Sequence, residues 1–473
     1  MKSKRILTIL TCCAILAGCT SPAPAAPTNT SAQADTGTNA AAADTGTSAT
    51  TVEPATYDGV TAVLARYPGE GEFADTDAQS FMESEAHWQW WEEYREKAAA
   101  SIAVQKNMDL YYSAMMRELL VTDETENTVC SPINIYIALA MLAECTDGNT
   151  RTQILNVLEV DSIETLRARV QALWEANYID TPVLTSLLAD SVWMRDGVTY
   201  NEETLQRLAD IYYASSFSGA MGTAEMDKAL QDWMNENTGG LLEDAVKEIH
   251  TTPETVLALV STIYYKAGWI DKFHEGATDK QTFHGAAGDS EVDMMHLTDM
   301  MSYYAGDKFG AVQLNLTDSG MMSFFLPDEG VDVKDLVTDE QVMQVIRGTY
   351  EQVSYPMVRL SVPKFRTEAK TDLMEVMQRL GMTDVMTGGL ADFTPLTTDS
   401  SLGDFALSSA EHAAVVEVDE EGVTGAAYTI MMVAEGTAEG GDEIDFVLDR
   451  PFFFTVTAHD GSILFAGIVQ NVL

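Results

Sequence analysis

The most informative residues for chemistry lie in one segment near the C-terminal end of the chain. It opens with two acids and a glycine and continues with small, uncharged residues, in the order Glu420, Glu421, Gly422, Val423, Thr424, Gly425, Ala426, Ala427, Tyr428 and Thr429. Alternate side chains of an extended strand share a face. One face would therefore be small or apolar: Val423, Gly425, Ala427, Thr429 and Met431. The opposite face would hold Thr424, Ala426, Tyr428 and Ile430. This pattern predicts a strand that can slide between two existing strands and leave the Tyr428 ring at a solvent face.

Sequence motifs of enzymes and metal sites are absent. The chain contains no nucleophile elbow, P-loop or dinucleotide fingerprint. Its 7 histidines are scattered, with no His-Glu-x-x-His or Cys-x-x-Cys spacing. The sequence therefore predicts a protein that is not an enzyme and that uses no metal or cofactor.

The charge of the chain is strongly acidic. Its 73 acids and 27 bases give a net charge of −46. Nucleic acids and polyanion cofactors require basic patches, so the charge argues against both as partners. It suits a protein that is soluble outside the cell. A basic protease partner and a merely solvated acidic surface both remain open as reasons for it.

The first residues are typical of a secretory signal. Lys2, Lys4 and Arg5 precede an apolar run at 6–17 that is too short to span a membrane. The run ends in Leu-Ala-Gly-Cys19, which resembles the lipobox of bacterial lipoproteins. The resemblance implies removal of 1–18 and a lipid on Cys19, holding the protein at the outer face of a bacterial cell membrane. A plain signal with an incidental cysteine is the alternative.

Composition divides the rest of the chain into three parts. Residues 19–56 are mostly small and polar, which predicts a disordered tether with a mean reach of about 30–35 Å. Residues 57–100 form a partly helical extension, in which Trp88, Trp90 and Trp91 could bind a partner or dock on the body. We expect one domain over 101–473, with Cys130 and Cys145 as buried thiols too far apart for a disulfide.

Hydrophobic periodicity predicts the elements of this domain. The expected helices are 79–98, 102–120, 132–145, 150–158, 162–177, 201–214, 225–237 and 370–380. The expected strands are 187–194, 255–265, 310–316, 321–326, 358–362, 412–418 and 451–469. Helices come mostly first and strands mostly last, which favours an α+β fold with a large sheet over a βαβ repeat.

About eight motifs in the correct order then identify a family resemblance over roughly residues 100–473. They include Asn127 to Pro132, Leu259 to Trp269, Pro363-Lys364-Phe365, Leu380-Gly381-Met382, Ala391-Asp392-Phe393, His412 to Gly422, Arg450-Pro451-Phe452 and Leu464 to Gly467. This order resembles the serpins. The resemblance implies a large central mixed and antiparallel sheet, flanking helices, an exposed mobile reactive loop and a monomeric protein. It also implies that the chain is a single-use substrate, which traps a protease when the cut loop inserts into the sheet.

Within the resemblance, residues 420–429 correspond to the hinge of the reactive loop. Val423 stands where the family usually has Thr or Ser, and Gly425 where it usually has Ala; both are compatible with insertion. The cut bond is expected among Ala434, Glu435, Gly436 and Thr437. Apolar and small residues precede it, and acids without bases follow it as far as Asp449. These residues favour a serine (or cysteine) protease specific for apolar, small or glutamate residues, and argue against a trypsin-like one.

The resemblance also implies a polar cluster at which the sheet opens. Its expected members are Ser131, Asn134, Ser261, Trp269 and His412. Asn134 stands where the family has a serine, and Ser261 stands where it has an asparagine. The two departures are reciprocal, so the pair is predicted to survive with its partners exchanged, unless both positions drifted independently.

Two functions remain after this reading. The first is a surface-tethered inhibitor of proteases, favoured by the small inward residues at 423–429. The second is a non-inhibitory binding or adhesion lipoprotein of the same fold, with a static loop.

Overall fold

A computed structural model describes residues 11–15, 55–57, 60–65, 67, 69–106, 108–123, 125–423 and 443–472. For 11–15 and 55–56 it describes the backbone alone. The predicted lipid site Cys19, nearly all of the predicted tether, the hinge residues 424–429 and the candidate cleavage residues 434–437 lie outside these ranges.

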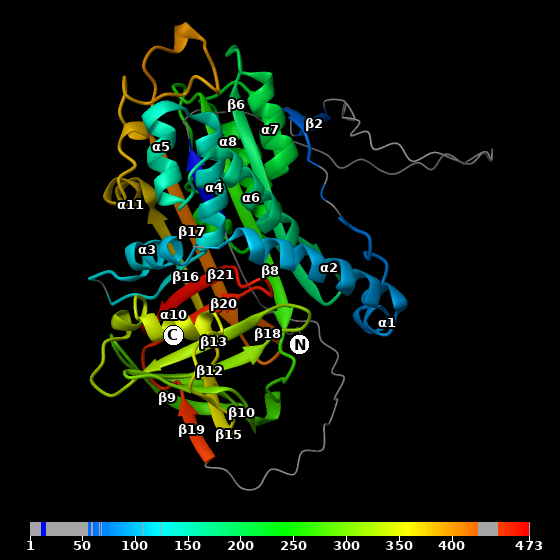
Figure 1. Cartoon of the computed structure of the whole chain (residues 1–473), viewed down its shortest axis with the longest axis vertical. Coiled ribbons are helices and arrows are strands. Elements are labelled where there is room, and N and C mark those ends of the chain that lie inside the picture. The colour runs from blue at the N-terminus through cyan, green and yellow to red at the C-terminus, as the bar shows by residue number, and fades with distance from the viewer. Residues whose placement is uncertain are drawn as a thin grey trace, which may run out of the picture.

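Helices gather at one end of the molecule and sheets extend to the other, in an α+β arrangement (Figure 1). The α-helices are α1 (Ala78–Met82), α2 (Glu85–Val104), α3 (Met108–Leu120), α4 (Pro132–Cys145), α5 (Gly148–Val157), α6 (Ile163–Asn177), α7 (Glu202–Tyr212), α8 (Ala224–Asn237), α9 (Glu243–Val246), α10 (Glu340–Ile346) and α11 (Leu373–Arg379). Short 3-10 turns occur at Glu275–Ala277, Val333–Leu336, Asp384–Met386 and Ser400–Leu402. No helix of the described residues combines the length and the apolarity that a membrane crossing requires.

The strands form three sheets. The largest has the order β16 (Phe365–Asp372), β17 (Ser409–Val418), β1 (Thr11–Ile15), β8 (Leu257–Gly268), β6 (Leu184–Arg195), β7 (Ala214–Gly219), β3 (Val60–Val63), β2 (Ala55–Tyr57), with β18 (Gly422–Val423) on β8 and β5 (Ile179–Asp180) on β6. The second is β19 (Glu443–Val447), β15 (Met357–Pro363), β10 (Gly288–Met300), β9 (Asp279–Gly285). The third is β14 (Val353–Ser354), β11 (Tyr303–Ala305), β12 (Phe309–Asn315), β13 (Met321–Pro327), β20 (Phe452–Thr457), β21 (Ile463–Val469), β4 (Thr128–Cys130).

Part of the predicted leader lies inside the largest sheet. Strand β1 pairs antiparallel with β17 on one side and with β8 on the other (Figure 1, dark blue). Two strand edges that face each other across a gap present rows of unpaired N–H and C=O groups, and an uncharged apolar segment can satisfy both. With β1 in this place, β17 and β8 are separated by the width of one strand.

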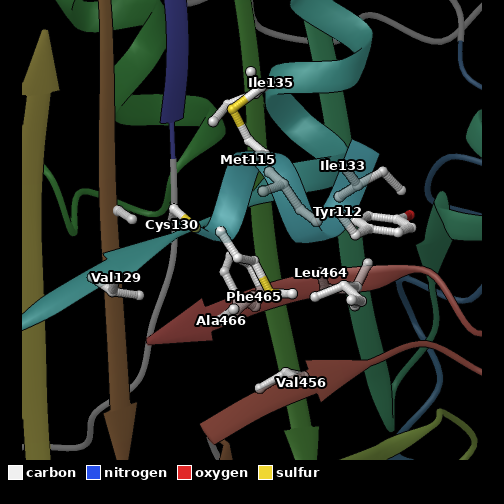
Figure 2. Packing of buried hydrophobic residues seen from close by; sticks show 14 of the residues in the cluster. Tyr112, Met115, Val129, Cys130, Ile133, Ile135, Val456, Leu464, Phe465 and Ala466 are labelled. Carbon is white, nitrogen blue, oxygen red and sulfur yellow. The ribbon is translucent and has the colours of Figure 1, made fainter. Parts of the chain in front are cut away.

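Helix α4 is central to the architecture. Pro132 at its first turn fixes a helical φ, as is favourable at that position. All of its residues are buried, because α4 runs between the largest sheet and the surrounding helices. Its first turn packs with α3, β4 and β21, where Met115, Ile133 and Phe465 meet (Figure 2).

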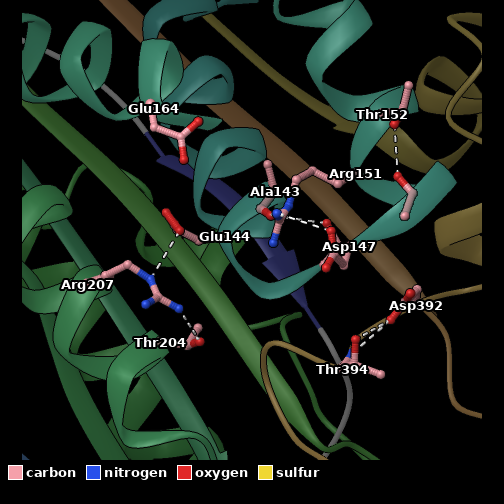
Figure 3. A network of polar contacts seen from close by, with 12 residues as sticks. Ala143, Glu144, Asp147, Arg151, Thr152, Glu164, Thr204, Arg207, Asp392 and Thr394 are labelled. Atoms are coloured by element: carbon pink, nitrogen blue, oxygen red, sulfur yellow. Dashed lines mark hydrogen bonds and ion pairs between the residues drawn. The ribbon is translucent and has the colours of Figure 1, made fainter. Parts of the chain in front are cut away.

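The far end of α4 is fixed by a buried carboxylate. Glu144 is fully buried and accepts hydrogen bonds from Arg167 of α6, the shortest at 2.5 Å. Arg207 of α7 lies 3.4 Å from the same carboxylate (Figure 3). Because removing one partner of a buried ion pair is costly, these contacts hold α4 firmly to its neighbours.

The N-terminal extension docks on the body. Strands β3 and β2 extend the edge of the largest sheet beyond β7, and β2 begins at Ala55, inside the predicted tether. His87 of α2 pairs with Asp318 at 2.8 Å, and Ser101 donates to the buried Asp460 at 2.5 Å. Trp90 and Trp91 are half-buried in this contact, whereas Trp88 remains 64% exposed.

Candidate functional site

The hinge begins in a tight turn at the end of β17. The Asp419 carboxylate accepts hydrogen bonds from the backbone N–H groups of Glu421 (2.9 Å) and Gly422 (3.3 Å). Such an Asx turn reverses the chain locally. It brings Gly422 and Val423 against β8, where they pair with Gly268 and Ala267.

Trp269 holds this turn from the end of β8. Its indole Nε1–H donates to the Asp419 carbonyl at 2.9 Å, and its backbone N–H donates to the Glu421 carbonyl at 3.2 Å. The ring is buried and packs edge-on against Phe273. The base of the loop is therefore attached to β8 by side-chain and main-chain contacts together.

The two hinge acids have separate cationic partners. Glu420 is buried, pairs with Lys364 Nζ at 2.5 Å and accepts from the Thr278 hydroxyl at 2.7 Å. Burial alone would raise the pKa of Glu420, but these hydrogen bonds outweigh it and lower the pKa. Glu421 is more exposed and accepts from Lys272 Nζ at 2.9 Å.

Gly422 is required by a close approach of two backbones. A Cβ at this position would lie 2.6 Å from the Gly268 Cα. Val423 follows and is fully buried, on the face predicted to enter the sheet. The described part of the hinge thus ends with its chain aligned along β8.

The predicted exchange between Asn134 and Ser261 is visible as two hydrogen bonds. The Ser261 hydroxyl donates to Asn134 Oδ1 at 2.8 Å, and Asn134 Nδ2 donates to the Ser261 carbonyl at 2.9 Å. Both residues are fully buried. The amide and hydroxyl are complementary with their positions reversed, so α4 is joined to β8 by a reciprocal pair.

His412 joins β17 to the start of the same helix. Its Nε2 accepts a hydrogen bond from the Ser131 backbone N–H at 3.0 Å. Burial lowers the pKa of His412 to about 3, so the ring is neutral at physiological pH and carries its proton on Nδ1. That nitrogen and the Ser131 hydroxyl have no hydrogen-bond partner among the described residues.

The structure divides the five residues expected at the opening point. Ser131, Asn134, Ser261 and His412 lie together around the first turn of α4. Trp269 lies beyond the other end of β8, about 26 Å along the strand from Ser261, and belongs to the hinge turn. Because the strand is extended, residues 261 and 269 cannot lie in one cluster. The prediction from the family resemblance, which placed Trp269 in the polar cluster, is therefore wrong for this residue.

Some partners of the hinge were not singled out from the sequence. Two segments converge on Glu420 and Glu421: the connection between β8 and β9 supplies Lys272 and Thr278, and the junction of β15 and β16 supplies Lys364. Lys364 was noted only as part of the Pro-Lys-Phe motif. Lys364 stands between β15 and β16, and its pairing with Glu420 depends on tertiary placement.

The register across the largest sheet relates the hinge to the polar cluster. Cys12 of β1 lies opposite both His412 and Ser261, so the polar residues of β17 and β8 face each other across one strand. Strand β18 runs in the same direction as β1, antiparallel to β8.

Comparison with known proteins gives one family. The family model described as "Serpin (serine protease inhibitor)" matches residues 108–472. Serpin A3-6 of Bos taurus is 27% identical over 374 residues, covering 77% of this chain and 87% of the relative. An uncharacterized serpin-like protein of Methanosarcina acetivorans is 25% identical over 384 residues, covering 80% and 88%.

Solved structures agree in fold. Tengpin, a thermophilic serpin solved in the native state, superposes with a TM-score of 0.68 at 23% identity, covering 78% of this chain and 94% of that one. Human thyroxine-binding globulin, solved with thyroxine, gives 0.64 at 22% identity, covering 80% and 99%. The α+β architecture described above is thus shared with both.

Proposed function

The chain belongs to the serpin family, and we propose that it is a suicide-substrate inhibitor of serine or cysteine proteases. In this proposal a protease cuts within 434–437, remains attached as an acyl-enzyme and is trapped when the cut loop enters the largest sheet. The observation that carries the proposal is the gap between β17 and β8, which accepts an extended segment in the direction set by β18.

The energy for this step would come from the sheet. Insertion adds ladder hydrogen bonds on two strand edges and buries the inward residues of the loop. Continued pairing from Val423 would bring Thr429 opposite Ser261, in the same row as His412. Small, uncharged inward residues meet no steric or charge barrier along this path.

The proposed partner is a protease that prefers apolar, small or glutamate residues. Residues 435–449 contain six acids and no lysine or arginine, which disfavours an enzyme that must bind a basic residue before it cuts. We further propose that the mature protein is held at the bacterial surface by a lipid on Cys19. Strand β1 would leave with the leader, so the gap would be free for the loop.

A panel of proteases tests the proposal. The mature protein is mixed with elastase-like, subtilisin-like and glutamate-specific enzymes, run on denaturing gels, and the released C-terminal peptide is sequenced. An SDS-resistant complex with a new N-terminus between 433 and 438 is the expected result. Cleavage or binding without any such complex would remove the inhibitor proposal.

The alternative is a non-inhibitory binding protein. It is supported by the likeness to thyroxine-binding globulin, whose structure holds a small ligand. In that case loop cleavage would leave no covalent complex, and the stability of the protein would be unchanged by it.

A further inference from the structure

A carboxyl group outside the family-derived cluster lies directly beside it. Asp190 is in β6 and pairs across the ladder with Ser261 of β8. Its side chain is fully buried. Directly opposed residues of neighbouring strands share a face, so Asp190, Ser261 and His412 form one polar row under the start of α4.

Asp190 is poorly supplied with partners for a buried carboxylate. Neither carboxyl oxygen accepts a hydrogen bond of good geometry, and the nearby Trp174 indole N–H is likewise unpartnered, among the described residues. No ion pair with Asp190 occurs in the described part of the chain either. A buried charge without a cation is costly, so this site favours the neutral acid.

The Ser261 hydroxyl links this carboxyl to the pair between α4 and β8. A hydroxyl has one proton to donate, and in the structure Ser261 donates it to Asn134. A neutral Asp190 can donate to the remaining lone pairs of Ser261 Oγ and thereby supports that bond. An ionised Asp190 can only accept, and it competes with Asn134 for the same proton.

We propose that Asp190 is a positioning residue of the sheet-opening cluster, whose protonation state decides whether Ser261 donates to Asn134. The neutral acid completes a chain from Asp190 through Ser261 to Asn134. The carboxylate draws the Ser261 hydroxyl to itself and loosens α4 from β8. That this loosening eases entry of the loop beside β8 rests on the proposed function.

The surroundings of Asp190 place the change in its protonation state near neutral pH. Burial raises the pKa of Asp190 to about 7, and polar contacts from Ser261 and Trp174 partly offset it. Among the described residues, Tyr67 of the N-terminal extension interacts with the charge of Asp190, and His412 lies farther along the same row, beyond Ser261 and Cys12. Burial, and secondarily the charge of Asp190, raises the pKa of Tyr67, and burial lowers the pKa of His412, so both side chains are uncharged near neutral pH.

A double-mutant cycle in the uncleaved protein tests the proposal without any protease. Unfolding is measured for the parent, Asn134→Ala, Ser261→Ala and the double variant at about pH 5.5 and about pH 8.5. The expected coupling is about tenfold in the unfolding equilibrium constant at the lower pH and close to none at the higher. Equal coupling at both pH values would overturn the proposal.

Two substitutions of aspartate separate this effect from general electrostatics. Asp190→Asn keeps an N–H donor to Ser261 and cannot ionise, so its coupling should stay high at both pH values. Asp196→Asn, at an exposed position just past the same strand, should retain the pH dependence of the parent. A pH-dependent coupling in the Asp190→Asn background would contradict the assignment.

If Asp190→Asn fails to fold, two measurements still test the proposal. One is the double-mutant cycle in the parent protein, and the other is an infrared titration of the buried carboxyl in protein labelled at aspartate. A carboxyl that ionises below about pH 5 would exclude the proposal. Because no loop cleavage is involved, failure of this test and failure of the inhibitor proposal are distinguishable.

Discussion

At the scale of single residues, the site depends on complementary polar groups held in a dry environment. Asn134 and Ser261 satisfy each other by two hydrogen bonds, while Glu420 is satisfied by Lys364 and Thr278. A buried polar group that loses its partner costs more than the bond contributed. Single changes at these positions should therefore be severe, and paired changes should not be.

Exchanging Asn134 and Ser261 tests this complementarity. Asn134→Ser or Ser261→Asn alone should lower the free energy of unfolding by about 1–3 kcal/mol, through an unpaired or crowded polar group. The double variant should recover much of the loss, as measured by denaturant unfolding. If the two losses simply add, the residues are not coupled and the reciprocal arrangement has no energetic meaning.

The hinge acid Glu420 should make stability depend on pH. Its folded pKa is lowered, so its contribution is present above the ordinary glutamate pKa and is lost as pH falls through the folded value. Glu420→Gln should therefore destabilise the protein by about 1–3 kcal/mol at neutral pH and by progressively less below about pH 4. Glu421→Gln, at a more exposed residue, is the matched control and should have a smaller effect. A constant difference between Glu420→Gln and the parent across this pH range would contradict the pairing.

At the scale of elements, the sequence predicted those with a strong apolar pattern. Helix α4 was predicted with its observed bounds, and β6, β8, β13 and β17 were located to within a few residues. Strands β9 and β10 were missed because charged residues occupy their exposed faces, so no apolar alternation marks them. Residues 370–372 were assigned to a helix but end β16, and 451–469 divides into β20 and β21 at a turn.

The candidate site was predictable to a similar extent. The Asn134 and Ser261 pair followed from two motifs far apart in the sequence, because a family resemblance supplied their proximity. Lys364 and Asp190 could not be assigned in this way. Their importance depends on which strands are neighbours, and that is fixed by the register of the sheet.

Two arginine substitutions in the hinge test the direction of insertion. Ala427→Arg should abolish the SDS-resistant complex while leaving cleavage intact, because its charge would have to enter the buried face at a cost of several kcal/mol. Ala426→Arg, on the outward face, should be far milder. Gel quantification of complex against cleaved product measures both. Similar behaviour of the two variants would mean that the face assignment is wrong.

At the scale of the whole molecule, the serpin domain carries two additions at its N-terminal side. The extension docks through α2 and adds β3 and β2 to the edge of the largest sheet. The residues before it are predicted to be a leader and a tether. If these predictions hold, the serpin domain would act at a distance from a membrane surface.

Anchoring can be tested at Cys19. Cys19→Ala should move the protein from the membrane fraction to the medium, or leave it as unprocessed precursor, because the lipid acceptor is gone. Fractionation and immunoblotting of cells carrying each form measure this. A processed, membrane-bound Cys19→Ala protein would exclude the lipid anchor.

The central claim is that the loop becomes a strand between β17 and β8. Amide hydrogen exchange of the mature protein, before and after cleavage within 434–437, tests it most directly at residues 257–268 and 409–418. The account predicts that the amides on the facing edges of both strands become strongly protected after cleavage, because each gains a ladder partner. Unchanged exchange at both edges would contradict it.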